Sequence, residues 1–190
     1  MSACDPKTLL LHCCCAPCGT YPIRLLSETY AVTAYFYNPN IHPKEEYLAR
    51  EKEMCQLMAK WNYPLIVGDY DDKLWFEAVK GLEKEPEGGK RCDICFKMRL
   101  LKTAETAKAH GIDSFTTTLS ISPHKNAELL NQIGHDVAKT VGISYVEANF
   151  KKKNGFKISC DLSAEEGLYR QNYCGCIYSK REMEERMNRR

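Results

Sequence analysis

The sequence contains no long hydrophobic run. Its apolar stretch from Thr8 to Leu11 is far too short for a membrane span or for the core of a signal peptide, and no basic segment precedes it. We therefore expect a protein that does not enter a membrane and that resides in the cytoplasm.

The sequence also lacks a strong charge of one sign. Its formal net charge is only +2 over 190 residues, so any binding of nucleic acid must come from a local patch of basic residues. There is no internal repeat and no low-complexity segment. Because 190 residues can bury a hydrophobic core of their own, we expect a single domain over residues 1–190.

Cysteine, in contrast, is abundant. The odd count of 11, the adjacent cysteines and the absence of a recognisable secretory leader argue against a disulfide framework and favour metal binding or redox chemistry. Cys4, Cys55 and Cys160 stand alone, and we interpret them as small buried hydrophobic residues. The other eight lie in segments 12–18, 91–95 and 173–176, which we expect to converge on one site.

Short apolar or β-branched runs alternate with segments of helical spacing. Strands are predicted at 8–11, 31–37, 64–67, 115–119 and 144–150, and helices at 21–28, 42–61, 74–82 and 96–110, with a further helix opened by Ser122-Pro123 and closed by Gly142. This alternation predicts an α/β fold with a mostly parallel sheet of about five strands, helices on both faces and Cys-rich metal-binding loops. Residues 180–190 form a charged tail that is either helical or flexible.

Three polar segments follow predicted strands, at 12–18, 38–42 and 120–126. The carboxyl ends of parallel strands meet at one edge of a sheet, where ligands of such folds bind. We therefore expect the site at this edge, with the Cys-rich segment at its centre.

The spacing of the cysteines suits metal ligands. Cys15 and Cys18, Cys92 and Cys95, and Cys174 and Cys176 form three close pairs, and eight thiolates exceed what one tetrahedral ion can use. Adjacent cysteines such as Cys14 and Cys15 should point to opposite sides of an extended chain. Two zinc ions, an iron–sulfur cluster, or a cluster beside a second metal all remain open. We predict these ligands: Cys14, Cys15, Cys18, Cys92, Cys95, Cys174 and Cys176. Cys13 is the weakest candidate, because it could be the last buried position of the first strand.

Together with these cysteines, several further motifs make the sequence similar to the QueH family of epoxyqueuosine reductases over nearly its whole length. They are F-Y-N-P-N-I-H-P at 36–43, E-Y-L-x-R at 46–50, R-C at 91–92 with R-L at 99–100, F-T-T-T-L-x-I-S-P-H-K-N at 115–126, F-K-K-K at 150–153 and L-Y-R-Q-x-Y-C-G-C at 168–176.

The resemblance implies a fold like that of the adenine nucleotide α-hydrolases (HUP) and an enzyme that removes the epoxide oxygen from epoxyqueuosine at the wobble position of tRNA, giving queuosine. It also implies a [4Fe–4S] cluster, a further mononuclear metal ion that we expect to be iron and that zinc can displace, and an external electron donor that it does not identify. Some relatives have Asp where Cys18 stands here, and both residues are anionic ligands.

Such a reaction needs a proton donor and residues that bind the RNA. We predict the proton donor among four residues: His42, His124, Tyr169 and Tyr173. His12 is expected to have a structural role. For the phosphates of tRNA we predict a basic group made of Lys151, Lys152, Lys153, Lys125, Arg170 and Arg99.

Other classes of protein would fit parts of this pattern. A zinc-binding module could bind RNA without redox activity. A thiol–disulfide oxidoreductase could use Cys15 and Cys18, and would have an exposed thiol of low pKa. An ATP-using tRNA-modifying enzyme would suit the fold, but no Ser-Gly-Gly-x-Asp phosphate loop follows the first strand, where the cysteines stand instead.

Overall fold

Strand β1 (Thr8–His12) lies at the centre of a five-stranded parallel sheet. The computed structural model describes residues 6–189, and its strand order is β3-β2-β1-β4-β5, with β2 (Ala31–Phe36), β3 (Leu65–Val67), β4 (Ser114–Thr117) and β5 (Ser144–Tyr145). Every neighbouring pair is parallel. The predicted α/β fold with a mostly parallel sheet of about five strands is thus confirmed.

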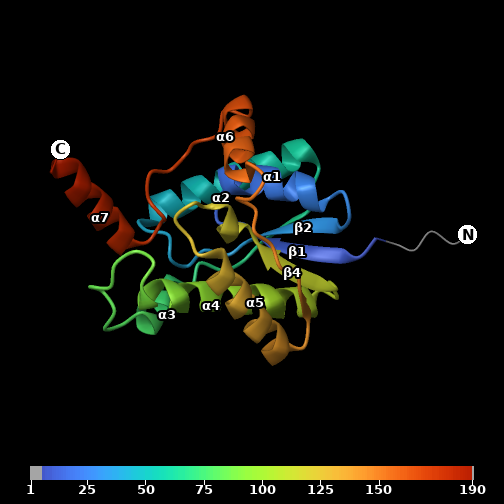
Figure 1. Ribbon diagram of the computed structural model, residues 1–190, viewed down its shortest axis with the longest axis horizontal. Coiled ribbons are helices and arrows are strands. Elements are labelled where there is room, and N and C mark those ends of the chain that lie inside the picture. The colour runs from blue at the N-terminus through green and yellow to red at the C-terminus, as the bar shows by residue number, and fades with distance from the viewer. Residues whose placement is uncertain (1–5, 190) are drawn as a thin grey trace, which may run out of the picture.

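Within residues 6–189, seven α-helices and one short 3-10 helix connect and follow the strands (Figure 1). They are α1 (Ala16–Leu26), α2 (Lys44–Trp61), α3 (Asp72–Ala78), α4 (Lys90–Ala109), the 3-10 helix Thr118–Ile121, α5 (Ala127–Val141), α6 (Gly155–Glu165) and α7 (Ile177–Asn188). No helix in residues 6–189 is both long and apolar enough to cross a membrane.

The helices cover both faces of the sheet. Side chains along β1 alternate between the two faces. Leu9 and Leu11 pack with residues of α1 and α2, whereas Leu10 packs with residues of α4 and α5. A strand buried on both sides needs a continuous apolar run, which is what positions 9–11 provide. Figure 1 shows α1 and α2 on one side of the strands and α4 and α5 on the other.

Several boundaries differ from the predictions, and two of the differences affect the cysteines. Helix α1 begins at Ala16 rather than near 21, because Pro17 suits a first helical turn, and so Cys18 is helical. Helix α4 begins at Lys90, so Cys92 and Cys95 also lie in a helix. The prediction that Cys-rich loops carry the ligands is therefore wrong for these residues.

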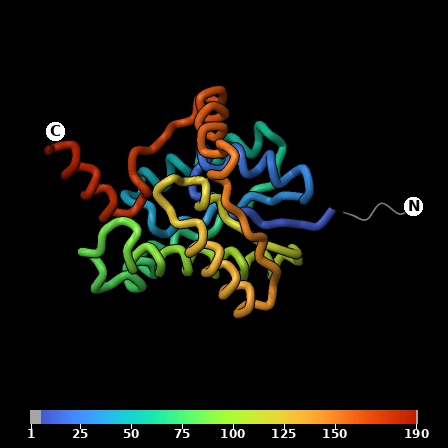
Figure 2. The backbone as a smooth tube through the Cα atoms, viewed as in Figure 1, coloured from blue at the N-terminus to red at the C-terminus, as the bar shows by residue number. Residues whose placement is uncertain are grey.

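Other differences lie further along the chain. Ser122 ends the 3-10 helix, and the N-cap of α5 is Asn126, whose side chain accepts the backbone N–H groups of Glu128 and Leu129. Strand β5 has only two residues, and helix α6 was not predicted. Most of the charged tail belongs to α7, which extends from the body beside the loop between α3 and α4 (Figure 2).

Candidate metal centre

Three cysteine sulfurs meet where β1 passes into α1. The Sγ atoms of Cys14, Cys15 and Cys18 all lie within 4.8 Å of one another, and those of Cys14 and Cys15 are 3.8 Å apart. The expectation that adjacent cysteines point apart is wrong here, since the chain bends at residues 14–15, just before α1 begins, although the backbone of Cys15 itself is extended. Cys13, by contrast, is fully buried in the core beneath α1 and is not part of this group.

The three thiols of this group shift one another's pKa values in opposite directions. The thiols of Cys15 and Cys18 hydrogen-bond to Cys14, which lowers the pKa of Cys14. The same interaction raises the pKa of Cys15 to about 12 and that of Cys18 well above its ordinary value. Three sulfurs this close can all become thiolates only if a metal ion replaces the protons. Three thiolates would leave one position open on a tetrahedral ion.

A second set of four cysteines lies nearby. Cys92 and Cys95 occupy the first turns of α4, and Cys174 and Cys176 flank Gly175 just before α7. Cys95 and Cys176 pack in one small core with Trp75. Burial raises the pKa of Cys92 to about 11, and the nearby Cys174, Cys95 and Cys176 also raise it. Among residues 6–189, only Cys14, Cys15 and Cys18 form a tight group, so these four sulfurs are spread more widely.

Backbone N–H groups point at two sulfurs of this second set. The N–H of Gly88 donates to Sγ of Cys92 at 3.2 Å, and that of Ser179 donates to Sγ of Cys176 at 3.3 Å. Such hydrogen bonds stabilise sulfur in its thiolate form, which is the form that binds a metal or a cluster.

Arg99 provides an independent indication of negative charge at the site. It is 1% exposed; one of its nitrogens donates to Oδ1 of Asn38 at 3.3 Å, while Nε and Nη2 have no partner. No carboxylate in the described part of the chain pairs with it. Burial alone would lower its pKa, but nearby cysteines, chiefly Cys95 and Cys174, raise it. Burial of a cation without a counter-ion costs free energy. Metal–thiolate groups formed by these cysteines would carry the negative charge that balances Arg99, so the residues present fit such groups.

A cavity of about 480 Å³ opens onto this region. Cys14, Cys18 and Cys174 line it, together with the cations Arg99 and Lys125. Burial alone would lower the pKa of Lys125, but nearby Cys174, Cys14 and Cys18 raise it. The cavity lies at the carboxyl edge of the sheet, where the sequence places the site, and we call it the cysteine cavity.

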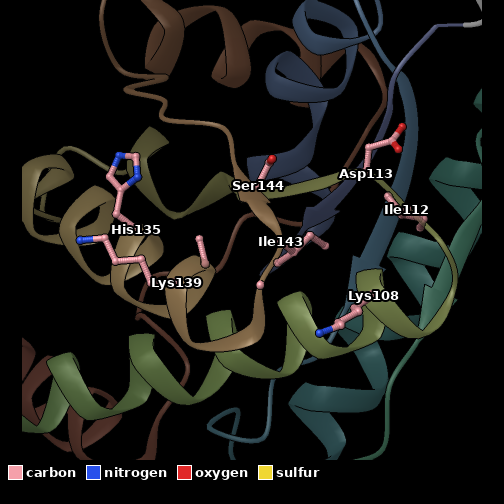
Figure 3. Close-up of a pocket in the computed structure, with 9 residues that line it drawn as sticks. Lys108, Ile112, Asp113, His135, Lys139, Ile143 and Ser144 are labelled. Atoms are coloured by element: carbon pink, nitrogen blue, oxygen red, sulfur yellow. The ribbon is translucent and has the colours of Figure 1, made fainter.

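A larger hollow of about 620 Å³ lies elsewhere (Figure 3). It is lined by Lys108, Asp113, His135, Lys139 and Ser144, and no cysteine reaches it. Asp113 and Ser144 stand at the starts of β4 and β5, so this hollow belongs to the amino edge of the sheet. It is shallow and holds no cysteine, whereas three cysteines line the cysteine cavity, so the metal-binding chemistry points to the latter.

The four predicted proton donors lie in different places. His124 and Tyr173 line the cysteine cavity. His42 does not; its ring packs against Trp75 and Phe76, with ring centres 5.4 and 4.6 Å away. Tyr169 is 50% exposed and also lies outside the cavity lining. His12 is buried between Oγ1 of Thr117 and the carbonyl of Tyr37, as a structural role requires.

The predicted RNA-binding residues divide in the same manner. Arg99, Lys125 and Arg170 line the cysteine cavity. Lys152 and Lys153 are exposed in the turn before α6, and Nζ of Lys151 donates to the carbonyl of Lys125 at 2.5 Å. The lysine run is thus tied to the rim of the cavity.

Sequence reasoning missed two residues that hold the site together. Nε2 of Gln171 donates to Sγ of Cys15 at 2.9 Å. Buried Arg50 pairs with Glu46 at 2.7 Å and donates to the carbonyls of Tyr173 and Cys174. Arg50 lies among alternating charges on α2 that resemble a solvated face, so only its place in the E-Y-L-x-R motif could have marked it.

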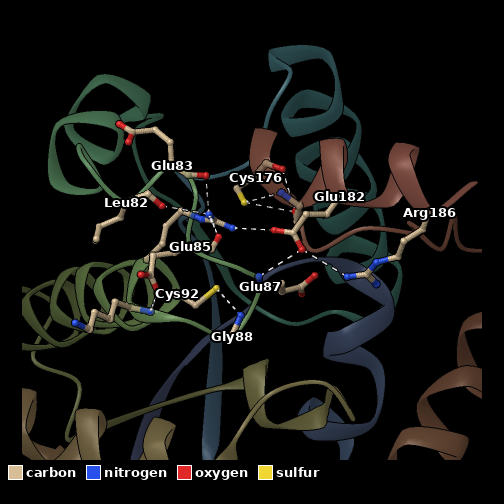
Figure 4. Close-up of polar contacts among 12 residues, drawn as sticks. Leu82, Glu83, Glu85, Glu87, Gly88, Cys92, Cys176, Glu182 and Arg186 are labelled. Carbon is tan, nitrogen blue, oxygen red and sulfur yellow. Dashed lines mark hydrogen bonds and ion pairs between the residues drawn. The ribbon is translucent and has the colours of Figure 1, made fainter. Parts of the chain in front are cut away.

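A polar network joins the two cysteine-bearing elements α4 and α7 (Figure 4). Arg91 is 1% exposed and donates to the backbone carbonyls of Leu82, Glu83 and Glu85. It also pairs with Glu182 of α7 at 3.4 Å, and Glu182 accepts the N–H of Glu87. The loop that carries Gly88 is therefore tied both to α4 and to α7.

Of the lone cysteines, Cys55 and Cys160 have no part in this centre. All ten cysteines in the described residues are free. Cys55 is exposed on α2, so its interpretation as a buried residue is wrong, and Cys160 is partly buried on α6. Cys4 lies outside the described residues.

Comparison with known proteins gives a consistent result. A family model described as "Epoxyqueuosine reductase QueH" matches residues 9–182. A protein of that name from Streptococcus pyogenes serotype M1 is 43% identical over 178 residues, which cover 90% of this chain and 70% of the relative. One from Haemophilus influenzae is 45% identical over 176 residues, covering 92% and 72%. One from Thermotoga maritima is 36% identical over 185 residues, covering 94% and 93%.

Proposed function

The chain belongs to the QueH family of epoxyqueuosine reductases, and we propose that it removes the epoxide oxygen of epoxyqueuosine at the wobble position of tRNA, giving queuosine. The observation that carries this proposal is the meeting of the Cys14, Cys15 and Cys18 sulfurs with the buried cation Arg99 at one cavity. A thiol–disulfide exchange enzyme that uses Cys15 and Cys18 is not favoured, since Cys15 is buried and the pKa values of both thiols are raised rather than lowered.

The reaction sets the requirements on the site. Both C–O bonds of the epoxide break and a C=C bond forms, while two electrons and two protons convert the oxygen to water. The electrons come from an external reductant. When bound, an iron–sulfur cluster and a neighbouring metal ion supply single electrons and a Lewis acid, respectively.

We assign the cysteines to two groups by their spacing. Cys14, Cys15 and Cys18 suit a single ion with one open position, expected to be iron. Cys92, Cys95, Cys174 and Cys176 suit a [4Fe–4S] cluster. Gln171 orients Cys15 through its hydrogen bond, and Arg50 holds the segment that carries Cys174.

Among the predicted proton donors, His124 is favoured because it lines the cysteine cavity; Tyr173 lines it too, but its only O–H proton is already engaged in a hydrogen bond. The O–H of Tyr173 donates to the carbonyl of His42 at 2.7 Å, which fixes the ring at the cavity wall. Lys125 and Arg170 at the cavity would contact the phosphates of the RNA, together with half-buried Lys151 and the exposed residues Lys152 and Lys153.

The test is a conversion assay with tRNA that carries epoxyqueuosine. The protein, purified and reconstituted with iron and sulfide without oxygen, is incubated with a chemical reductant, and the RNA is digested to nucleosides. Mass spectrometry should find a product lighter by one oxygen atom. A Cys14→Ser variant should abolish conversion, whereas Cys55→Ser, on the exposed face of α2, should retain it. Absence of product with fully loaded protein would overturn the proposal.

A further inference from the structure

A second, smaller cavity adjoins the cysteine cavity along α7. It has a volume of about 170 Å³. Both cavities are bordered by Glu87, Asn172, Tyr173 and Arg186, so one continues into the other. The remaining lining residues are Ser179, Met183 and Met187, and we call this space the α7 cavity.

The apolar residues in the later turns of α7 line this cavity. After its first turn the helix consists of charged and polar residues except for Met183 and Met187, and both of these line the cavity. With Ser179 they are spaced four residues apart, which places them on one face of the helix. Met187 is 63% exposed, an unusual position for an apolar side chain on an otherwise charged helix. Methionine adapts its shape to flat apolar ligands.

Tyr173 gives the space an aromatic wall. Its hydroxyl donates to the carbonyl of His42 at 2.7 Å, and the guanidinium of Arg50 lies 5.2 Å from the centre of its ring. The ring is therefore fixed before any ligand arrives. Fixed aromatic rings are the usual stacking surface for bases of single-stranded RNA.

Charge and size identify the occupant. Arg186 borders both cavities, as does Glu87, and its mostly exposed guanidinium pairs with Glu182 at 3.5 Å. Its remaining donors can meet a phosphate that joins two nucleotides. The α7 cavity is about a third as large as the cysteine cavity, 170 against 480 Å³, which suits one flat base rather than a whole nucleoside or a peptide segment.

We propose that the α7 cavity binds the nucleobase next to the modified nucleotide in the RNA chain. This inference rests on the proposed function, because it takes the cysteine cavity as the site of the modified base. It makes α7 the element by which the enzyme prefers an RNA chain to a free nucleoside.

The test compares binding of RNA hairpins that carry epoxyqueuosine in an anticodon loop. One hairpin is intact, and two others lack the base on the 5′ or the 3′ side of the modified nucleotide. For the unaltered protein, one of the two abasic hairpins should bind at least about fivefold more weakly, the lower end of what stacking of one base contributes. For the double variant Met183→Ser/Met187→Ser, the intact hairpin and that abasic hairpin should bind equally.

Leu48→Ser is the control, since Leu48 is a similarly exposed apolar residue on α2, 50% exposed, and should keep the full abasic penalty. Equal binding of all hairpins by the unaltered protein overturns the inference, as does an undiminished abasic penalty in the double variant. The conversion assay is run on the same intact hairpin. If the unaltered protein reduces it, the proposed function stands in both of these cases. If the unaltered protein neither binds nor reduces the intact hairpin, the proposed function fails as well.

Discussion

Arg99 shows most clearly how burial changes the meaning of a residue. From the sequence it was one basic residue among several predicted to contact RNA phosphates, because a helix of mixed charges gives no sign of which side chains face inward. The structure buries its guanidinium among four cysteines with two donors unpartnered. Its position favours a role as the counter-ion of the metal–thiolate groups.

This role predicts opposite effects of Arg99→Met on the two forms of the protein. Without metal, removal of a buried cation that has no carboxylate partner should leave the melting temperature unchanged or raise it. After reconstitution without oxygen, the variant should hold fewer irons than the unaltered protein, because the thiolate charge is no longer balanced. Arg99→Lys, which keeps the charge, should recover most of the metal. Full metal content in Arg99→Met would contradict the assignment; metal analysis and thermal melts measure both effects.

At the scale of single elements, the sequence predicted the strands well and the cysteine-bearing helices poorly. The run at 8–11 and the β-branched segment from 31 had to be strands, and both are. The start of α1 at Ala16 depends on Pro17, and the start of α4 at Lys90 depends on glycine-rich turns, where weak local preferences leave the boundary open. The bend at residues 14–15 brings the Cys14 and Cys15 sulfurs together. It depends on packing beneath α1, which cannot be predicted from the local sequence.

The turn before α7 carries one strict conformational requirement. Gly175 has a φ of +135°, and a Cβ there would lie 3.0 Å from Cγ1 of Ile41 and 3.3 Å from Nη1 of Arg50. Gly175→Ala should cost about 1–3 kcal/mol of stability and displace Cys174 and Cys176. The iron content after reconstitution should therefore fall. Gly81→Ala is the matched control, since Gly81 also has a positive φ, +82°, but has no neighbour within 4 Å of its Cβ position. Equal iron content in both variants would argue against the cluster assignment.

The contact between Glu182 and Arg91 ties α7 to α4. Because Arg91 is 1% exposed and Glu182 28% exposed at the side chain, Glu182→Ala leaves a nearly buried guanidinium without its carboxylate. We expect a loss of about 1–3 kcal/mol in the free energy of unfolding, measured by urea denaturation. Glu184→Ala, which removes a more exposed carboxylate of the same helix, should change stability by well under 1 kcal/mol. Equal effects would show that the contact does not hold α7.

At the scale of the whole molecule, the carboxyl edge of the sheet carries the cysteine cavity and the group of Cys14, Cys15 and Cys18. The alternation of strands and helices was enough to predict this edge, because parallel strands deliver their carboxyl ends to the same side. The cysteine spacing led us to expect segments 91–95 and 173–176 at the same site, but it did not show how they reach it, since their position depends on how α4 and α7 pack against the remainder. Long-range contacts such as that of Gln171 with Cys15 span most of the chain and leave no local pattern.

The basic residues of this edge should govern how RNA binding responds to salt. Replacing Lys151, Lys152 and Lys153 by Ala should weaken tRNA binding and flatten the dependence of log affinity on log salt by up to about 3 units of slope, one for each lost phosphate contact. Lys80, Lys84 and Lys102, changed together, provide a control of equal charge change. The lysine assignment fails if the affinity of the first triple variant is unchanged across salt concentrations.

The central claim is that the cysteines hold a cluster and a separate metal ion. Purification without oxygen, followed by analysis of iron, zinc and acid-labile sulfide with a visible spectrum, tests it most directly. Our account predicts about four irons with matching sulfide per chain, a broad brown absorption band, and about one further metal ion that Cys18→Ala removes while the sulfide remains. Zinc alone, with neither sulfide nor colour after reconstitution, would contradict it and would favour a zinc-binding module without redox activity.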